Sequence, residues 1–255
     1  MKQTSSHLTI LSLSASLLTG CTLYADELNE HSVGPASEDA AAESVEETAA
    51  ALTQGYNGSV AGDYASRYYN DPNTYFYNWE YEGGDCTNFA NQSILAGLVG
   101  STNKYDVFAG RIRFQDREYS SNDWWYQSTS PVLQRAEPEW AGANGLYQYL
   151  QNQARNPGYK GLIVAAPGRW SGRTLQMLNL APHFIKGSII SLTGSVGTSA
   201  YHSMVVAQGG ADMSRVIVAY RSAPGYPHSR RSLQSYVNSN PDSIYNLFWI
   251  TGFRM

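Results

Sequence analysis

Apolar and polar positions follow a helical period in the first half of the folded region and a strand-like period in the second. Apolar and aromatic side chains recur at helical spacing over residues 60–69 and again over 139–154, which predicts two amphipathic helices. A third helix is expected to start at Cys86, where apolar and small residues form a packing face as far as Leu98. Small side chains permit close packing, so we expect this third helix to lie at the centre of the fold.

From residue 162 onward, short runs rich in β-branched and aromatic residues are separated by turn residues and predict strands. Helices that precede strands along the chain favour the α+β class, with helices packed on an antiparallel sheet. The aromatic segment 75–81 is also expected to be extended, and residues 99–130 are expected to be rich in loops. The predicted strands are 162–166, 188–192, 204–207, 216–220 and 247–250.

The first 21 residues have the pattern of a secretory leader, with Lys2 as the positive residue and an apolar run over 8–18. This run is too short to span a bilayer as a helix. The leader ends in Leu-Thr-Gly-Cys at 18–21, which resembles the bacterial lipoprotein box, in which the cysteine becomes the lipidated first residue. We therefore expect an exported protein of the cell envelope, anchored at a bacterial cell membrane through lipid on Cys21. The alternative is an ordinary signal peptide that is cut at another position.

Charge divides the rest of the chain into two regions. Residues 22–55 hold eight acidic and no basic side chains in an Ala- and Glu-rich sequence, which predicts a tether. Residues 56–255 are long enough for one sizeable domain, and their 16 basic and 13 acidic side chains do not indicate nucleic-acid binding. The 19 tyrosines and six tryptophans favour two interpretations equally, a surface for sugars and peptides or a tyrosine-rich core.

Cys86 is the cysteine that remains once Cys21 is assigned to the lipid anchor. An exported chain with one remaining cysteine is not a disulfide scaffold, so this thiol is either a buried small hydrophobe or a reactive group. It follows a Gly-Gly turn at 83–84 and Asp85, whose carboxylate could cap the helix. We expect the positive helix end to lower the pKa of the thiol and the Cys86 N–H to bind an oxyanion.

A nucleophilic thiol needs a base, and the domain contains three histidines. His202 stands at the start of the apolar stretch 201–206, where a strand end could hold its imidazole beside a cleft in an ion-paired Cys–His couple. His183 precedes a turn and His228 lies in a loop rich in Gly and Pro. For each of the three, an ordinary surface or packed ring is the alternative, so position alone favours His202 only slightly.

The residues around Cys86 resemble the signature of a known family. The string Gly-Gly-Asp-Cys-Thr-Asn-Phe-Ala-Asn-Gln, residues 83–92, is similar to that of the bacterial putative amidase domain family, and the similarity extends from Tyr56 to about Phe253. Members of this family resemble papain-like cysteine amidases and peptidases and are related to CHAP- and NlpC-type cell-wall hydrolases. The resemblance implies a papain-like α+β fold, in which N-terminal helices that include the cysteine helix pack on an antiparallel β-sheet.

The resemblance also implies that Cys86 is the nucleophile and that His202 is the base. Two positions depart from the family pattern: Ser188 stands where an aspartate is expected, and Arg221 lies near the position where many relatives have a histidine. In papain-like folds, a polar residue on the next strand orients the catalytic histidine. Because Arg221 cannot accept a proton from imidazole, Ser222 or a backbone carbonyl is the candidate for that role.

These residues predict an enzyme that hydrolyses amide bonds. The Cys86 thiolate attacks the carbonyl, His202 protonates the departing amine, and water then hydrolyses the thioester. The Cys86 N–H at the helix N-terminus, beside Asp85, would hold the oxyanion with a second donor, for which Tyr81 and Asn88 are candidates. Neither a metal nor a nucleotide cofactor is expected, because ligand spacing and a Gly-rich phosphate loop are both absent from the sequence.

An exported, lipid-anchored domain encounters peptidoglycan before most other substrates, so peptide amides of peptidoglycan are the expected substrate. A transferase that passes the same acyl group to an amine would use the same residues. The main alternative is a catalytically weak or inactive lipoprotein that keeps the amidase fold and binds cell wall or a peptide partner. The departures at Ser188 and Arg221 favour this alternative.

Overall fold

The structure is a computed structural model. It describes residues 53–82, 84–114, 124, 126–127, 135–136, 140, 142–195, 199–223 and 228–255. The predicted leader, Cys21 as the predicted site of lipidation, and all but the end of the predicted tether lie outside the described residues. None of the helices in the described ranges combines the length and the apolar character needed to cross a membrane.

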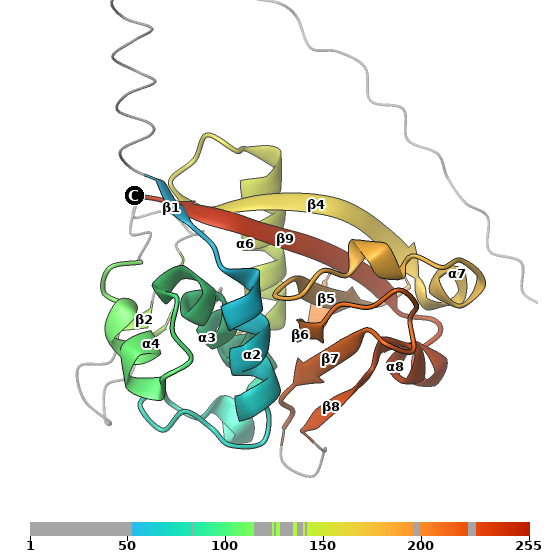
Figure 1. Cartoon of the computed structure of the whole chain (residues 1–255), viewed down its shortest axis with the longest axis horizontal. Helices are drawn as coiled ribbons and strands as arrows, with labels where there is room; N and C mark the ends of the chain where they lie inside the picture. Colours follow the sequence, from blue (N-terminus) through green and yellow to red (C-terminus); the bar gives the residue numbers. More distant parts are fainter. Residues whose placement is uncertain are drawn as a thin grey trace, which may run out of the picture. The chain divides into compact units, whose positions relative to one another are not determined.

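The described strands form one large antiparallel sheet and one small one (Figure 1). The large sheet has seven strands in the order β1-β9-β5-β6-β7-β8, and β4 pairs with the other edge of β9. The small sheet pairs β2 with β3. The strands are β1 (Thr53–Gly55), β2 (Tyr126–Gln127), β3 (Arg135–Ala136), β4 (Gly161–Ser171), β5 (Ile189–Thr193), β6 (Ala200–Gln208), β7 (Ile217–Tyr220), β8 (Ser229–Ser232) and β9 (Ile244–Arg254).

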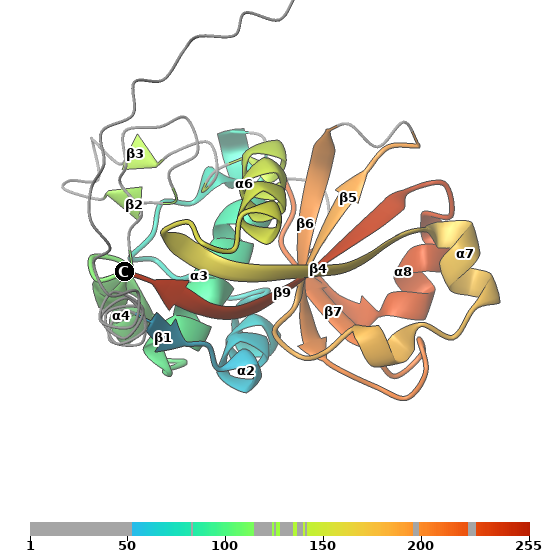
Figure 2. The ribbon, with the colours of Figure 1, turned by 90° about the horizontal axis from the view of Figure 1, so that it is seen from above.

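Six α-helices and two short 3-10 helices are described. In Figure 2, α2, α3 and α6 gather at one end of the large sheet, whereas α7 and α8 lie at the other end. Helices α2, α3 and α6 all pack against β6. The helices are α2 (Gly58–Tyr68), η1 (Trp79–Glu82), α3 (Cys86–Val99), α4 (Lys104–Gly110), α6 (Ala143–Arg155), α7 (Gly172–Met177), η2 (Ala181–His183) and α8 (Leu233–Ser239).

The large sheet is covered by apolar side chains on both faces. Along β6, Val205 packs in the cluster with α2, α3 and α6, whereas Met204 and Val206 pack in the cluster with α7 and α8. Successive side chains of a strand point to opposite faces, so this alternation follows directly from strand geometry. His202 lies two positions before Met204 on the same strand, so its side chain points to the same face of the sheet, the one that packs against α7 and α8.

The α3 helix is buried along its whole length from Cys86 to Leu98. Small side chains make this possible: a Cβ added at Gly97 would lie 2.2 Å from the ring of Tyr56. The helix ends at Gly100, which has a positive φ of 76° and donates its N–H to the Ala96 carbonyl at 2.9 Å. The central position expected for this helix is therefore confirmed.

The α+β class and the antiparallel sheet are confirmed, and all five predicted strands are present with somewhat different ends. The prediction of an extended segment at 75–81 is wrong. The chain turns there and enters η1, because the Asn78 side chain accepts the Glu80 N–H at 3.0 Å and Asp85 accepts the Trp79 N–H at 3.1 Å. Such local side-chain bonds compete with strand pairing.

The structure also contains elements that were not predicted. Helix α4 lies within the region expected to be loop-rich, and the Asn103 side chain caps it by accepting the Tyr105 and Asp106 N–H groups at 2.8 Å and 3.2 Å. The short elements α7, α8, β1 and β8 were not predicted. Since β1 pairs with β9, the folded domain includes residues 53–55, which the charge pattern assigned to the tether.

The turn before β5 is intact although Ser188 departs from the expected aspartate. Gly187 has a positive φ of 86°, and its N–H donates to the Val206 carbonyl at 2.8 Å. The Tyr56 hydroxyl donates to the Gly187 carbonyl, also at 2.8 Å. The Ser188 hydroxyl is buried and has no partner among the described residues, so the substitution leaves one unsatisfied polar atom instead of a disrupted turn.

Candidate functional site

Cys86 is the first residue of α3, and Asp85 stands at the N-cap position. The predicted cap is nevertheless wrong, because the Asp85 side chain makes no hydrogen bond to the helix backbone. Its Oδ2 lies 2.7 Å from Nη1 of Arg221, and its Oδ1 accepts the Trp79 N–H at 3.1 Å and the Asn88 amide at 2.7 Å. A buried guanidinium therefore draws the carboxylate away from the helix end.

Asp85 and Arg221 form a buried ion pair, with side chains 0% and 2% exposed. Arg221 follows β7 directly, so the pair joins the end of that strand to the start of α3. Burial raises the pKa of Asp85, while Arg221 and then Asn88 oppose that rise. The Nε of Arg221 has no hydrogen-bond partner among the described residues, so the pair acts mainly through charge. Each ion depends on the other, because a lone charge is expensive to bury.

His228 supports the same corner of the site. Its Nδ1 accepts the backbone N–H of Ser222 at 3.0 Å, and its Nε2 faces Oε1 of Glu80 at 3.6 Å. Burial and then the charge of Arg221 lower the pKa of His228, which favours the neutral ring that this hydrogen bond requires. His228 therefore fixes the backbone that carries Ser222.

The two candidates for a second oxyanion donor do not line the cavity beside Cys86. Asn88 is buried: its amide donates to the Tyr77 carbonyl at 2.9 Å and to Asp85, and its oxygen accepts the Trp140 Nε1–H at 2.9 Å. Tyr81 is 81% exposed. Asn88 thus serves the core around the ion pair. Gly84, with a φ of 113°, lines the cavity instead.

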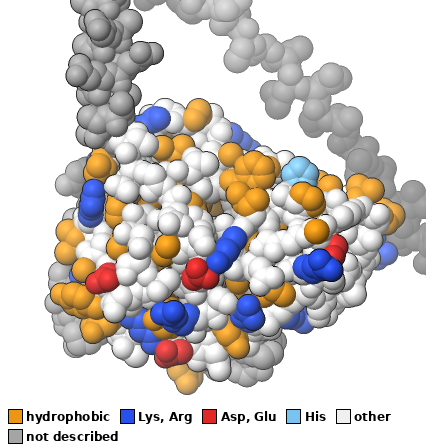
Figure 3. Space-filling view, viewed as in Figure 1, with side chains coloured by type: hydrophobic (Ala, Val, Ile, Leu, Met, Phe, Trp, Pro, Cys, Tyr) orange, Lys and Arg blue, Asp and Glu red, His pale blue; other side chains and the backbone are white. Residues whose placement is uncertain are grey.

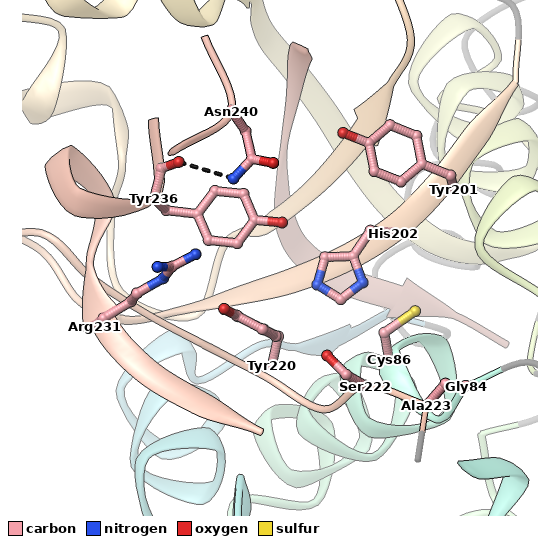
Figure 4. A pocket seen from close by; sticks show the side chains of 10 residues that line it. All are labelled: Gly84, Cys86, Tyr201, His202, Tyr220, Ser222, Ala223, Arg231, Tyr236 and Asn240. Atoms are coloured by element: carbon pink, nitrogen blue, oxygen red, sulfur yellow. Dashed lines mark hydrogen bonds between the residues drawn. The ribbon is translucent and has the colours of Figure 1, made fainter. Parts of the chain in front are cut away.

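Cys86 and His202 line one cavity of about 510 Å³ (Figure 4). The Cys86 sulfur points toward the imidazole of His202, which is the third residue of β6. The backbone N–H of Ser203 is also directed at this sulfur. Helix α3 and strand β6 thus bring the two predicted catalytic side chains together, although 115 positions of the sequence separate them.

Aromatic rings surround the His202 imidazole. The Tyr220 ring meets it edge-on, with centroids 4.9 Å apart, and the Tyr236 ring lies nearly parallel to it at 6.4 Å. No side chain in the described ranges donates or accepts a hydrogen bond at the imidazole, and Ser222, the predicted orienting residue, makes none. Packing against two tyrosines therefore holds the ring in place.

The protonation states differ from the prediction. Burial raises the pKa of the Cys86 thiol; the Ser203 N–H and the Thr87 hydroxyl oppose this rise, whereas the charge of Asp85 adds to it. Burial also lowers the pKa of His202 to about 4. Both directions oppose the predicted low thiol pKa and ion-paired couple, because loss of hydration outweighs the helix end. Both shifts favour a protonated thiol beside a neutral imidazole.

Five aromatic or polar side chains that line the cavity were not predicted as site residues. They come from β6, β7, β8, α8 and the residue that follows α8, and only the alternation along β6 and β7 could have drawn attention to any of them. Strand β8 escaped prediction because its sequence Ser-Arg-Arg-Ser is polar throughout. The five are Tyr201, Tyr220, Arg231, Tyr236 and Asn240.

His183, the remaining candidate for the base, lies away from the cavity. His183 lies in η2, is exposed, and contacts the ring of Trp170 at 5.6 Å, away from the cavity. Within the described ranges, no group of three or more His, Cys, Asp or Glu side chains is placed to hold a metal ion.

A family model described as "Putative amidase domain" matches residues 55–247, which is more than half of the chain. The chain belongs to the putative amidase domain family. Comparison with curated proteins and with solved structures gives no match. The matched residues of the amidase domain contain Cys86, His202 and the Asp85–Arg221 pair, and membership of this family supports a hydrolase that acts on amide bonds.

Replacement of Arg221 by methionine should destabilise the amidase domain strongly. The change leaves the buried Asp85 carboxylate without a counter-ion, so the free energy of unfolding should fall by about 3–5 kcal/mol. Urea unfolding followed by tryptophan fluorescence would measure the loss. Asp85→Asn nearly keeps the shape of the side chain but removes its negative charge, and so tests the anion of the same pair.

Arg173→Met is the matched control. Arg173 and Asp242 lie 2.8 Å apart, but their side chains are 70% and 72% exposed. Breaking this pair should change the free energy of unfolding by less than about 1 kcal/mol. Equal losses from Arg173→Met and Arg221→Met would show that burial of the Asp85–Arg221 pair has no special effect.

The raised thiol pKa predicts a rising pH profile for alkylation of Cys86. With iodoacetamide, the rate should increase about tenfold per pH unit from pH 6 to beyond pH 8.5, because the thiolate fraction does so below the pKa. Mass spectrometry of the peptide containing Cys86 would give the rate. The His202 ring should titrate with a midpoint near 4 in a proton NMR experiment. The imidazole is thus neutral above that pH and able to accept a proton.

His202→Gln serves as the control for the alkylation profile. If thiol and imidazole are both neutral, this variant should keep the rise with pH. A wild-type rate that is already constant above pH 6, together with a rise restored by His202→Gln, would instead demonstrate an ion-paired thiolate.

Proposed function

We propose that this chain is a cysteine amidase in which Cys86 is the nucleophile and His202 is the general base and acid. The observation that supports it most is the convergence of these two side chains on one cavity. Cys86 stands at the start of the buried helix α3 and His202 stands on strand β6 of the central sheet, so both are held rigidly. Rigid placement of nucleophile and base is what acyl transfer requires.

The protonation states determine the first step of the proposed reaction. Since the thiol keeps its proton at neutral pH, His202 takes that proton as the sulfur attacks the amide carbonyl. The tetrahedral intermediate collapses, the C–N bond breaks, and the imidazolium returns its proton to the leaving amine. Water then gives a proton to His202 and attacks the thioester, which releases the acid and restores the Cys86 thiol.

The helix start supplies a donor for the oxyanion. Because Asp85 pairs with Arg221 and does not cap α3, no side chain among the described residues caps the N–H groups of the first turn. The Cys86 N–H lies beside its own sulfur and can donate to the carbonyl oxygen that the sulfur attacks. The ion pair thereby positions the nucleophile and leaves this donor available.

The arrangement of the cysteine helix against an antiparallel sheet supports a papain-like fold for the domain. The lipoprotein box at residues 18–21 and the acidic segment after it support export and a lipid anchor on Cys21. We propose peptide amides of peptidoglycan as the substrate, because an enzyme anchored in the cell envelope would meet them first. A transferase would be recognised by transfer of the same acyl group to an added amine.

A second candidate function is peptide or cell-wall binding without turnover. The observation that favours it is an imidazole that no described side chain orients by a hydrogen bond, beside a buried thiol whose pKa burial raises. Such a pair is less activated than an ion pair. The cavity with its tyrosines would then serve recognition alone.

Loss of either catalytic side chain should abolish amide hydrolysis. Cys86→Ala and His202→Gln are each expected to lower the release of new amino groups from purified peptidoglycan by about 1,000-fold or more, as for other nucleophile and base removals. His183→Gln is the matched control, because His183 is exposed and does not line the cavity. This control should retain wild-type activity.

Circular dichroism must show that all three variants are folded. If folded, reduced wild-type protein releases no amino groups from peptidoglycan or from simple peptide amides, binding without turnover is the better description. Hydrolysis that survives in Cys86→Ala would exclude the cysteine mechanism.

Cys21 should carry the membrane anchor. In bacterial cells grown with radioactive palmitate, the full chain should incorporate the label and sediment with membranes, whereas Cys21→Ala should do neither. Cys86→Ala is the control and should behave as wild type. Unlabelled wild-type protein in the soluble fraction would contradict the lipid anchor.

A further inference from the structure

The cavity contains a cation that the proposed hydrolysis does not use. Arg231 is the third residue of β8 and shares a sheet face with Tyr220, since Val218 pairs with Arg231 and Tyr220 with Ser229. The Arg231 Cζ lies 4.6 Å from the centre of the Tyr236 ring and 5.9 Å from that of Tyr220. In Figure 4 the guanidinium lies beside Tyr236, well away from the Cys86 sulfur.

The charge of Arg231 has no counter-ion among the described residues. Three other arginines do have one: Arg173 pairs with Asp242, Arg215 with Asp212, and Arg221 with Asp85. The Nε of Arg231 is buried and makes no hydrogen bond within the described ranges. None of the described residues that line the cavity is acidic. A partly buried guanidinium without an anion is costly, so the cavity is suited to receive one from outside.

The surroundings of Arg231 favour a carboxylate. A guanidinium presents its N–H groups in a planar fork that matches the two oxygens of a carboxylate. The Tyr236 ring, over which the Arg231 Cζ lies at 4.6 Å, restrains the guanidinium and so reduces the entropy lost on binding. A ligand of the cavity that is also an amide substrate would most simply be a peptide, and peptides carry carboxylates at their ends and on acidic side chains.

Two ring distances limit where the carboxylate would lie. The His202 and Tyr236 rings are 6.4 Å apart, and Arg231 Cζ is 4.6 Å from the Tyr236 ring. Arg231 Cζ is therefore within roughly 11 Å of the imidazole, a distance that about three extended residues span. A carboxylate bound there would be within about three residues of the amide that Cys86 attacks.

We infer that Arg231 binds a carboxylate of the substrate, so that the cavity selects peptide amides with a free carboxylate within about three residues of the cleaved bond. The carboxylate comes from the chain end or from an acidic side chain. This specificity rests on the proposed cysteine amidase function. Arg231 contacts the substrate at its carboxylate and takes no part in bond cleavage.

Binding to the full chain with Cys86→Ala tests the inference without turnover. Isothermal titration calorimetry would compare acetyl-Ala-Ala-Ala with its C-terminal carboxamide, and acetyl-Ala-Glu-Ala-amide with acetyl-Ala-Gln-Ala-amide. The first pair tests a chain-terminal carboxylate, and the second tests an acidic side chain. In at least one pair, the peptide with the carboxylate should bind about tenfold or more tightly than its amide counterpart, as expected for a hydrogen-bonded charge.

Arg231→Gln, added to Cys86→Ala, should reduce this preference to about one. Arg230→Gln is the matched control, because Arg230 is exposed and points to the other face of β8, and it should keep the preference. Arg231→Lys keeps the charge but loses the planar fork and should retain only part of the preference. Circular dichroism would confirm that the variants are folded. If Arg231→Gln does not fold, the reduced preference of Arg231→Lys tests the inference.

Equal affinity within both peptide pairs, a preference that persists in folded Arg231→Gln, or an undiminished preference in folded Arg231→Lys would overturn the inference. These outcomes are independent of catalysis, because the titrated protein lacks its nucleophile. Failure of the wild-type chain to hydrolyse any amide would overturn the proposed function and leave the binding result standing. The two failures are thus distinguishable.

Discussion

The buried ion pair between Asp85 and Arg221 is the constraint on which the site depends. It joins the first turn of α3 to the end of β7 at a point where neither ion can be hydrated. Cys86 follows the one ion and Ser222 follows the other, so the pair fixes the cysteine relative to the cavity wall. The same pair explains why the helix start is uncapped: a carboxylate that neutralises a buried guanidinium cannot also accept N–H groups of the helix. Two features of the site, its position and its free backbone donors, therefore have one physical cause.

Burial also influences the chemistry of the proposed nucleophile and base. A helix N-terminus favours a thiolate by a modest amount, whereas removal of water disfavours every isolated charge and does so more strongly in a closed site. In this domain the second effect prevails for both partners, since it raises the pKa of Cys86 and lowers that of His202. A neutral pair can still transfer a proton when charge develops on the attacked carbonyl, because the oxyanion and the imidazolium then stabilise each other. Activation is thereby linked to substrate binding.

The fold was more predictable from the sequence than the site. Periodicity was sufficient for the central helix from Cys86 and for the strands, because both depend on local apolar patterns. The string around Cys86 and the position of His202 were sufficient to name the pair that meets in the cavity. The polar contacts were not predictable: Asp85 bonds across the fold instead of along its helix, and Asn88 joins the core. Such choices depend on which residues lie opposite in space, and Arg221 is 136 positions away from Asp85. Strand β8 was missed because its alternate side chains are polar on both faces.

Two arginines of similar sequence context acquire opposite roles from their surroundings. Arg221 departs from the family pattern, and in sequence alone it argues against activity. In the structure it is the counter-ion of Asp85, the residue before Cys86, which makes it part of the support of the site. Arg231 follows it by ten positions on the next strand, yet no described carboxylate lies beside it. A charge that is satisfied within the fold stabilises the protein, whereas one that is left unsatisfied in a cavity favours a ligand of opposite charge. The location of acidic partners, and not the arginine itself, determines which of the two roles each residue has.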